Sequence, residues 1–279
     1  MAQPLLWVVV PCYREHQLHW VLDNFARQEY ANKKLCIVEN GEAIGGCYRL
    51  GLHADMVVTS REHVSHARNE GMYAVRDRHD DGWVCMWDDD DWYAPAYLAE
   101  VAALIEEDKA EVYGKHRHFV AFPNNGLYLF NERNQNKYVE FVHGPTLTFR
   151  PEEAVLFHVQ REAEEIRWCA DMRRLGARVW ASSVHNMLYL RYTMGHQHAW
   201  NAEDGLVLMA SKQNDYYYWL GDTDLDVITG KVPWQSRVLR QEGERTPPPL
   251  QLEGPLTKVP VLPPRAYKPT WATVPTGRM

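Results

Sequence analysis

The first half of the chain alternates short apolar runs with stretches in which apolar residues recur every three or four positions. Short apolar runs predict buried strands, and the three-to-four spacing predicts amphipathic helices. The predicted strands are Leu5–Val10, Leu35–Val38, Met56–Thr59 and Trp83–Trp87, and the predicted helices are Gln17–Arg27 and Ser65–Arg78. This alternation indicates an α/β fold with a mainly parallel sheet and covering helices.

The second half of the chain is less regular. Its early apolar runs predict strands at Val112–Phe122, Leu127–Phe130 and Tyr138–Val142, and Asn125-Gly126 is a strong hairpin signal between the first two. The remaining predicted elements are the helix Arg161–Leu175, which Gly176 ends, and the strands Arg178–Ala181 and Met187–Tyr192. From Thr246 onward the chain is rich in proline, which predicts an extended tail.

Four consecutive aspartates, Asp88–Asp91, follow the predicted strand Trp83–Trp87. A bare acidic run is commonly a solvated charged surface. This run instead lies between Trp87 and Trp92, and Pro95 after it can open a helix at its first turn, so a disordered acidic tract is the poorer interpretation. Clustered carboxylates after a buried strand predict a divalent cation that holds a phosphate-bearing substrate.

Two further polar segments come directly after predicted strands. Pro11-Cys12-Tyr13 follows the first strand and Glu39-Asn40-Gly41 follows the second. Because open parallel sheets bind ligands beyond the carboxyl ends of their strands, we expect these segments and the aspartates to converge on one crevice.

Composition sets the outer limits of function. A chain of 279 residues with 46% hydrophobic content can bury a substantial core. The net charge of -7 provides no overall attraction to nucleic acid or anionic membranes, although a local basic patch remains open.

The cysteines and apolar runs indicate a cellular compartment. The five cysteines are odd in number and form no C-x-x-C pair, which favours a reducing, cytoplasmic location and core positions for the thiols. The apolar start Leu5–Val10 lacks a basic leader and stops at Pro11, so a strand is expected rather than a signal peptide. No run approaches the roughly 20 apolar residues that span a bilayer, so we expect no transmembrane segment.

Five segments in order resemble the motifs of the family-two glycosyltransferases, which are nucleotide-sugar-dependent enzymes with the GT-A fold. Val8–Glu15 is similar to the opening strand with its Pro-x-Tyr-Asn-Glu turn, and Ile37–Gly41 is similar to the second-strand motif. Ser65–Gly71 resembles the Ala-Arg-Asn-x-Gly helix start, and the aspartates fall where the Asp-x-Asp motif belongs. Glu164–Cys169 with Arg173–Gly176 resembles the Glu-Asp helix that carries the catalytic base.

The resemblance implies a donor site built on a divalent cation, Mn²⁺ or Mg²⁺, and a nucleotide sugar that we expect to be UDP-linked. Counting back from Pro95 aligns Asp88 and Asp90 with the two acids of the Asp-x-Asp motif. Asp90 is the first choice for direct metal ligation, and Asp88 would reach the ribose or a metal-bound water. Asp89 and Asp91 would set the conformation of the loop.

Other donor-binding residues are implied by their motif positions. They are Pro11, Tyr13 and Glu15 after the first strand, Glu39 after the second, and Arg68 on the helix. Glu39 would accept hydrogen bonds from the base or ribose. Arg68 would pair with the pyrophosphate or fix the acidic loop, and a salt bridge on the helix surface is the simpler alternative.

An inverting transfer also needs a general base for the acceptor hydroxyl. Glu165 aligns with the family's aspartate base, while Glu162 and Glu164 compete with it. Because glutamate replaces aspartate, this base reaches further by a methylene group.

Two pairs of histidines deserve separate expectations. The resemblance implies that His198 or His196 completes the metal shell, with His198 preferred, and hydrogen-bonding loop histidines are the alternative. His116 and His118 match no motif and are expected to be structural.

The predicted protein is a metal-dependent, inverting glycosyltransferase with its GT-A domain at residues 1–230. The nucleotide-sugar half would span residues 1–110, the acceptor half 111–230, and a proline-rich extension 231–279. Alternatives are a GT-A-like nucleotidyltransferase, although Pro11–Arg14 is not its Gly-rich basic loop, and a non-catalytic binder of nucleotides or sugars. The acceptor is left open between a glycan, a protein and modified nucleic acid such as a hydroxymethylated DNA base.

Overall fold

The computed structural model describes residues 3–60, 63–122, 126–130, 134–158, 164–190, 217–221 and 223–235. Its longer helices are α1 (Leu18–Ala26), α2 (Gly46–Leu50), α3 (Val64–Arg76), α4 (Tyr97–Glu106), α5 (Glu164–Arg174) and α7 (Leu225–Ile228). Short 3₁₀ turns lie at η1 (Glu15–Gln17), η2 (Gly41–Ala43) and η3 (Gly144–Thr146). In the part of the chain that the structure describes, no helix is long and apolar enough to cross a membrane.

The main sheet has the strand order β3-β2-β1-β4-β10-β6-β11-β9. Its strands are β1 (Leu6–Cys12), β2 (Lys33–Glu39), β3 (Met56–Thr59), β4 (Trp83–Met86), β6 (Val112–Gly114), β9 (Lys137–Tyr138), β10 (Thr148–Phe149) and β11 (Val179–Ala181). Strands β3, β2, β1 and β4 are parallel neighbours, whereas β10 runs antiparallel to both β4 and β6. The carboxyl ends of the four parallel strands therefore share one edge of the sheet.

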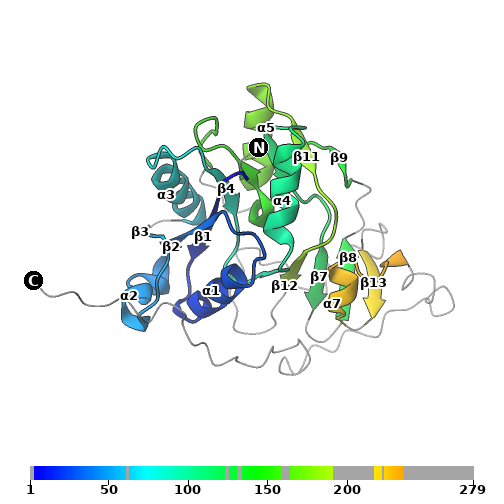
Figure 1. Ribbon diagram of the computed structural model, residues 1–279, viewed down its shortest axis with the longest axis horizontal. Coiled ribbons are helices and arrows are strands. Elements are labelled where there is room, and N and C mark those ends of the chain that lie inside the picture. Colours follow the sequence, from blue (N-terminus) through cyan, green and yellow to red (C-terminus); the bar gives the residue numbers. More distant parts are fainter. Residues whose placement is uncertain are drawn as a thin grey trace, which may run out of the picture.

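Helices cover both faces of the main sheet, and β1 shows why. Because side chains alternate along a strand, Leu6, Val8 and Val10 enter the core under α1 and α4, while Trp7 and Val9 enter the core under α3 and α5. Figure 1 shows the parallel strands between these helices. A Cβ at Gly71 of α3 would lie 2.4 Å from a Val9 methyl, so this glycine permits the close approach of α3 to the sheet.

A second sheet packs beside the first, with the order β13-β8-β7-β12-β5. It contains β5 (Trp92–Tyr93), β7 (Phe119–Phe122), β8 (Gly126–Phe130), β12 (Met187–Leu190) and β13 (Tyr217–Gly221). Helix α7 lies against it in Figure 1 and shares its hydrophobic core through Val227 and Ile228.

The α/β prediction is confirmed, as is the hairpin, where β7 pairs antiparallel with β8 and Phe122 stands opposite Gly126. Strand β1 continues through Pro11 to Cys12, although the sequence predicted that it stops at Pro11. The missing N–H of proline is tolerated there because the register of β1 with β4 already ends at Val9 opposite Met86.

Two predicted strands of the second half are wrong. Val112–Phe122 is divided into β6 and β7, which belong to different sheets, and the strand predicted at Tyr138–Val142 is only Lys137–Tyr138. The break in the first falls at the polar residues 115–118. Lys115 is buried there, and its ammonium donates to the Glu100 carboxylate at 3.1 Å at the point where the chain passes from one sheet to the other.

The five cysteines are all buried and unpaired, as the core interpretation expected. The proline-rich stretch from Thr246 lies outside the described residues, so the extended tail stays a prediction.

Three histidines gather where the connection between the two sheets meets η3; His116 and His118 are buried, and His143 is half-buried. The ring centroids of His118 and His143 are 4.5 Å apart, and those of His116 and His143 are 6.2 Å apart. Burial lowers the pKa of His118 well below its usual value and the pKa of His143 to about 4. The expected structural role of His116 and His118 agrees with this packing, and His143 joins them.

We predict that His143 makes stability depend on pH. Because the folded state keeps His143 neutral to about pH 4, only the unfolded state takes up its proton below about pH 6.5, and folding loses free energy as the pH falls. In His143→Gln this penalty is absent. Between pH 6.5 and pH 5 the unfolding free energy of the wild type should therefore fall by up to about 2 kcal/mol relative to that of His143→Gln.

Urea denaturation at a series of pH values measures this difference, with His53→Gln at an exposed position as the control. A difference between wild type and His143→Gln that stays constant with pH would contradict the prediction.

Candidate active site

The aspartates form a short loop between β4 and β5 whose two ends are clamped by aromatic rings. Trp87 and Tyr93 stack face to face with ring centroids 4.0 Å apart. The Tyr93 hydroxyl accepts a hydrogen bond from the Asp88 backbone N–H at 3.0 Å and donates to the Pro145 carbonyl at 3.0 Å. The apolar residues around the acidic run thus fold the loop at the edge of the sheet and tie it to η3.

Asp91 is the most buried member of the loop, with 0% exposure. Its Oδ1 accepts a hydrogen bond from the Leu190 backbone N–H at 3.1 Å, and its carbonyl oxygen accepts from Trp20 and Asn24. Among the described residues its Oδ2 has no hydrogen-bond partner. A buried carboxylate oxygen of this kind is costly unless a ligand satisfies it.

Asp88, Asp90 and Asp91 each offer an oxygen to one small region, with these oxygens within 4.8 Å of one another. They are the one such group of potential metal ligands found in the part of the chain described. Oxygen ligands in this number suit Mg²⁺ or Mn²⁺, and the unsatisfied Asp91 oxygen gives a cation a further reason to bind. The donor set therefore fits the cation that the sequence predicted, with Asp91 added to Asp88 and Asp90.

The loop concentrates negative charge in a poorly solvated place. Burial first, and then repulsion from Asp90, raise the pKa of Asp89 to about 7 and the pKa of Asp91 well above its usual value. Burial also raises the pKa of Asp88, against the opposing effect of Arg68. A divalent cation would lower all three pKa values by favouring the charged forms.

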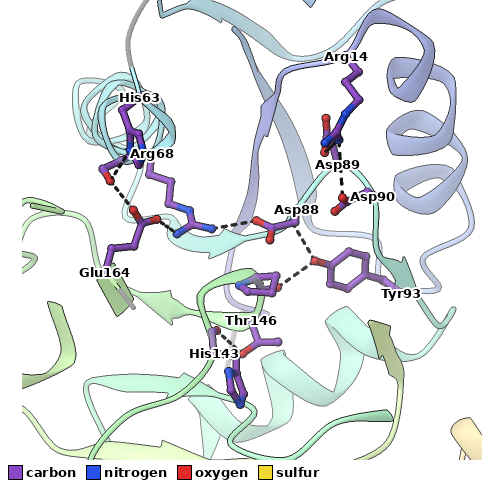
Figure 2. Close-up of polar contacts among 12 residues, drawn as sticks. Arg14, His63, Arg68, Asp88, Asp89, Asp90, Tyr93, His143, Thr146 and Glu164 are labelled. Atoms are coloured by element: carbon purple, nitrogen blue, oxygen red, sulfur yellow. Dashed lines mark hydrogen bonds and ion pairs between the residues drawn. The ribbon is translucent and has the colours of Figure 1, made fainter. Parts of the chain in front are cut away.

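Arg68 joins the loop to helix α5 (Figure 2). Its Nη2 donates to Asp88 Oδ1 at 2.9 Å, and its Nη1 donates to Glu164 Oε1. Ser65 donates to the other oxygen of Glu164, and His63 Nδ1 lies 3.1 Å from the Ser65 hydroxyl. Arg68 is 5% exposed, so the surface salt bridge considered as its simpler alternative is not what the structure shows.

The two candidate bases on α5 differ in their surroundings. Glu164 is buried with both carboxylate oxygens held, by Arg68 and Ser65. Glu165 is half-buried, and burial raises its pKa, while its own backbone N–H and Arg68 lower it. A raised pKa brings a carboxylate closer to the range in which a general base works. Glu162 lies outside the described residues.

The turn after β1 approaches the acidic loop. The Tyr13 backbone N–H donates to Asp89 Oδ2 at 3.1 Å, and Arg14 Nη1 lies 3.5 Å from Asp89 Oδ1 and 3.7 Å from Asp90 Oδ2. The Tyr13 ring is 51% exposed and rests on Gly41, where a Cβ would lie 2.2 Å from the ring. The three segments therefore meet as predicted: Gly41 lies against the Tyr13 ring, and Tyr13 donates to Asp89 of the acidic loop.

Three other predicted donor-binding residues have protein partners. Glu39 is 3% exposed, and its two carboxylate oxygens accept the backbone N–H groups of Gly45 and Cys47 at 2.6 and 2.7 Å. Glu15 pairs with Arg49, and Pro11 is buried within β1. The structure thus gives Glu39 a role in folding the loop after β2, and the donor contacts of these residues stay predictions.

Sequence reasoning missed Arg14 and underestimated Asp91. The signal for Asp91 was available in principle, because in a run of four acids the last one is nearest the buried strand that follows. His196 and His198, the predicted histidine ligands, lie outside the described residues.

The fold matches solved glycosyltransferase structures. TarS of S. aureus, residues 1–349 in complex with UDP-GlcNAc, aligns with 17% identity and a TM-score of 0.52 over 85% of this chain and 73% of that one. A mannosyltransferase from Pyrobaculum calidifontis, in complex with GDP-Man and Mn²⁺, aligns with 16% identity and a TM-score of 0.50 over 70% of this chain and 59% of that one. The α/β fold is therefore the GT-A fold.

A family model described as glycosyl transferase family 2 matches residues 7–160, more than half of the 279 residues. The chain belongs to this family, and the resemblance drawn from its motifs is confirmed. The match includes the acidic loop and Arg68 but ends before α5, so it does not test Glu165.

Two further findings bound the comparison. The chain spans about 60% of the length of several structures that it matches. No curated protein sequence matches it significantly.

We predict that Arg68 and Glu164 stabilise the protein as a pair. Replacing either partner leaves a buried charge without its counterpart, so Arg68→Met and Glu164→Gln should each lower the free energy of unfolding by about 3–5 kcal/mol. The double variant buries neither charge, and its loss should be clearly smaller than the sum of the single losses.

Urea denaturation of the four proteins completes this double-mutant cycle. The pair Arg78→Gln and Glu107→Gln, both exposed and far apart in the chain, serves as the additive control. Losses that simply add for Arg68 and Glu164 would show that the two side chains are not coupled.

Proposed function

We propose that this protein is a metal-dependent, inverting glycosyltransferase that moves a sugar from a nucleoside diphosphate sugar to an acceptor hydroxyl. The observation that carries the proposal is the convergence of Asp88, Asp90 and Asp91 at the carboxyl edge of a family 2 glycosyltransferase sheet. A bare acidic cluster would be weak support. Here the loop also accepts the backbone N–H of Tyr13, whose ring is exposed, and Arg68 links Asp88 to Glu164, the neighbour of the half-buried Glu165.

The donor nucleotide would lie along the turn after β1. The exposed face of Tyr13 offers a stacking surface for the base, and the cluster next to it would hold Mn²⁺ or Mg²⁺ with Asp90 and Asp91 as ligands. Asp88, which accepts a hydrogen bond from Arg68, would contact the ribose or a metal-bound water. We propose a UDP-linked donor. The similar structures contain UDP-GlcNAc in one case and GDP-Man in another, so both nucleotides belong in the test.

The chemical step requires a charged leaving group and a proton acceptor. The bond between the anomeric carbon and the diphosphate oxygen breaks, and its electron pair leaves with the nucleoside diphosphate. Asp90 and Asp91 would hold a divalent cation, which would supply the positive charge that offsets this developing negative charge. Glu165 removes the proton of the acceptor hydroxyl as its oxygen bonds to the anomeric carbon from the opposite face. Glu164 holds Arg68, and Arg68 holds Asp88, so α5 positions the base relative to the donor loop.

The acceptor enters the proposal only as a hydroxyl compound. A glycan, a protein and a hydroxymethylated DNA base are the three classes to be tested as acceptors. The net charge of -7 makes the nucleic-acid acceptor the least supported of the three.

We predict that the purified protein releases sugar slowly from a nucleotide sugar when Mn²⁺ or Mg²⁺ is present and that chelation by EDTA abolishes the release. Asp90→Asn and Asp91→Asn should each weaken Mn²⁺ binding at least tenfold, because each removes a charged oxygen ligand. A panel of UDP- and GDP-sugars, followed by nucleotide release, measures the activity. If no nucleotide sugar is turned over with either cation, the proposal is wrong, and pyrophosphate release from a sugar phosphate with a nucleoside triphosphate would favour a nucleotidyltransferase.

We predict that Glu165→Gln lowers kcat for transfer by about 10²–10⁴-fold, because the amide cannot accept the acceptor's proton. The affinity for UDP with Mn²⁺, measured by thermal shift, should stay within about twofold of wild type. Glu107→Gln, exposed at the end of α4, removes the same charge far from the loop and serves as the control. Unchanged kcat in Glu165→Gln would exclude Glu165 as the base and direct attention to Glu164.

A further inference from the structure

Helix α3 contacts the chain around α5 at two places. At the first, Arg68 donates to one carboxylate oxygen of Glu164 (Figure 2), and Ser65 donates to the other. At the second, the side chain of Asn69 pairs with the backbone of Phe157: its Oδ1 accepts the Phe157 N–H at 2.8 Å, and its Nδ2 donates to the Phe157 carbonyl at 2.9 Å. Ser65, Arg68 and Asn69 are spaced i, i+3 and i+4, so they lie on one face of α3.

The contact made by Asn69 reaches α5 through the segment to which Phe157 belongs. Two residues earlier, the Val155 carbonyl accepts the Trp168 indole N–H at 2.8 Å, and the Val155 N–H donates to the Met172 sulfur at 3.4 Å. The Phe157 ring also stacks on the Trp168 ring, with centroids 5.2 Å apart and planes 11° apart. This segment therefore bridges Asn69 of α3 to two successive turns of α5.

The two contacts together set the rotation of α5 about its axis. A helix that is held at one position can still turn about that position. Glu164 and Trp168 are four residues apart, so they lie on one stripe of α5, and holding both fixes the direction in which that stripe faces. Glu165 follows Glu164 in sequence and projects about 100° around the axis from it. The direction of the Glu165 side chain thus depends on contacts that its neighbours make.

We infer that Asn69 is a positioning residue for the proposed base: by holding Phe157, it keeps α5 in the rotation that directs Glu165 to the acceptor hydroxyl. The inference rests on the proposed function and deepens it. Asn69 is 8% exposed and has both polar atoms of its amide on the Phe157 backbone, so it acts through α5 and not on a ligand. Leucine at this position has a similar volume but would leave the Phe157 N–H and carbonyl without these partners.

A double-mutant cycle on the full chain tests the inference. It measures UDP or GDP release from the nucleotide sugar that wild type turns over, with water as the acceptor. Asn69→Leu should lower kcat about tenfold to 10²-fold through a small misplacement of the base, while the affinity for UDP with Mn²⁺ stays within about twofold of wild type. In the Glu165→Gln background no base remains to be positioned, so Asn69→Leu should change kcat by less than about threefold.

Tyr30→Phe is the control for a loss of stability alone. The buried Tyr30 hydroxyl donates to the Pro4 carbonyl at 2.6 Å, near the amino end of β1 and away from the acidic loop. Hydrogen exchange read by mass spectrometry should be faster for the α5 amides in Asn69→Leu and unchanged in Tyr30→Phe. If Asn69→Leu does not fold, Asn69→Ala takes its place, because its small side chain lets water reach the Phe157 backbone, and the same results are expected.

Four results would overturn the inference. They are unchanged kcat in the Asn69 variant, a loss that multiplies with that of Glu165→Gln, unchanged exchange of the α5 amides, and unchanged kcat in Glu165→Gln itself. Wild-type protein that turns over no nucleotide sugar would overturn the proposed function and this inference together. Wild-type protein that is active and depends on Glu165, with no effect of the Asn69 variant, would overturn this inference alone.

Discussion

The structure of the site depends on one electrostatic constraint, the placement of four consecutive carboxylates at the end of a buried strand. Charges in such a position must be paired, hydrogen-bonded or neutralised. Each aspartate with a partner of known geometry is held by a different part of the chain: Asp88 by Arg68 of α3, Asp89 by the turn after β1, and Asp91 by the N–H of Leu190 in the second sheet. The acidic loop is therefore the point at which the two sheets and the helix layer are joined.

The same contacts tie the first half of the chain to the second. Strand β10, which comes late in the sequence, inserts between β4 and β6 of the main sheet, and the β12 strand of the second sheet reaches the loop through Leu190. Helix α5 adds Glu164, which closes the connection through Arg68. The carboxylates of the acidic loop are therefore hydrogen-bonded to elements from both halves of the chain.

The hydrophobic pattern was sufficient to predict those helices and strands in which one pattern runs through the whole element. The apolar run of β1 and the helical spacing of α3 are each consistent with one local structure, and five motifs in order indicated the family. The prediction was wrong where the hydrophobic pattern changes within one segment. Val112–Phe122 is apolar at both ends, but its polar centre carries Lys115, whose buried ion pair with Glu100 cannot be anticipated without knowing that α4 lies alongside.

The same distinction holds for the site. Strand ends and motif spacing were enough to predict the GT-A fold, the place of the acidic loop at the carboxyl edge of the sheet, and Arg68, Glu164 and Glu165 as candidate residues. The surroundings of each carboxylate could not be predicted, because they depend on how distant segments pack together. Among the described residues Asp91 keeps an unsatisfied buried oxygen beside the second sheet, both carboxylate oxygens of Glu39 accept N–H groups of the loop after β2, and Arg68 is held between Asp88 and Glu164. Adjacent aspartates are chemically identical in a sequence, and they differ only through burial and through partners distant along the chain.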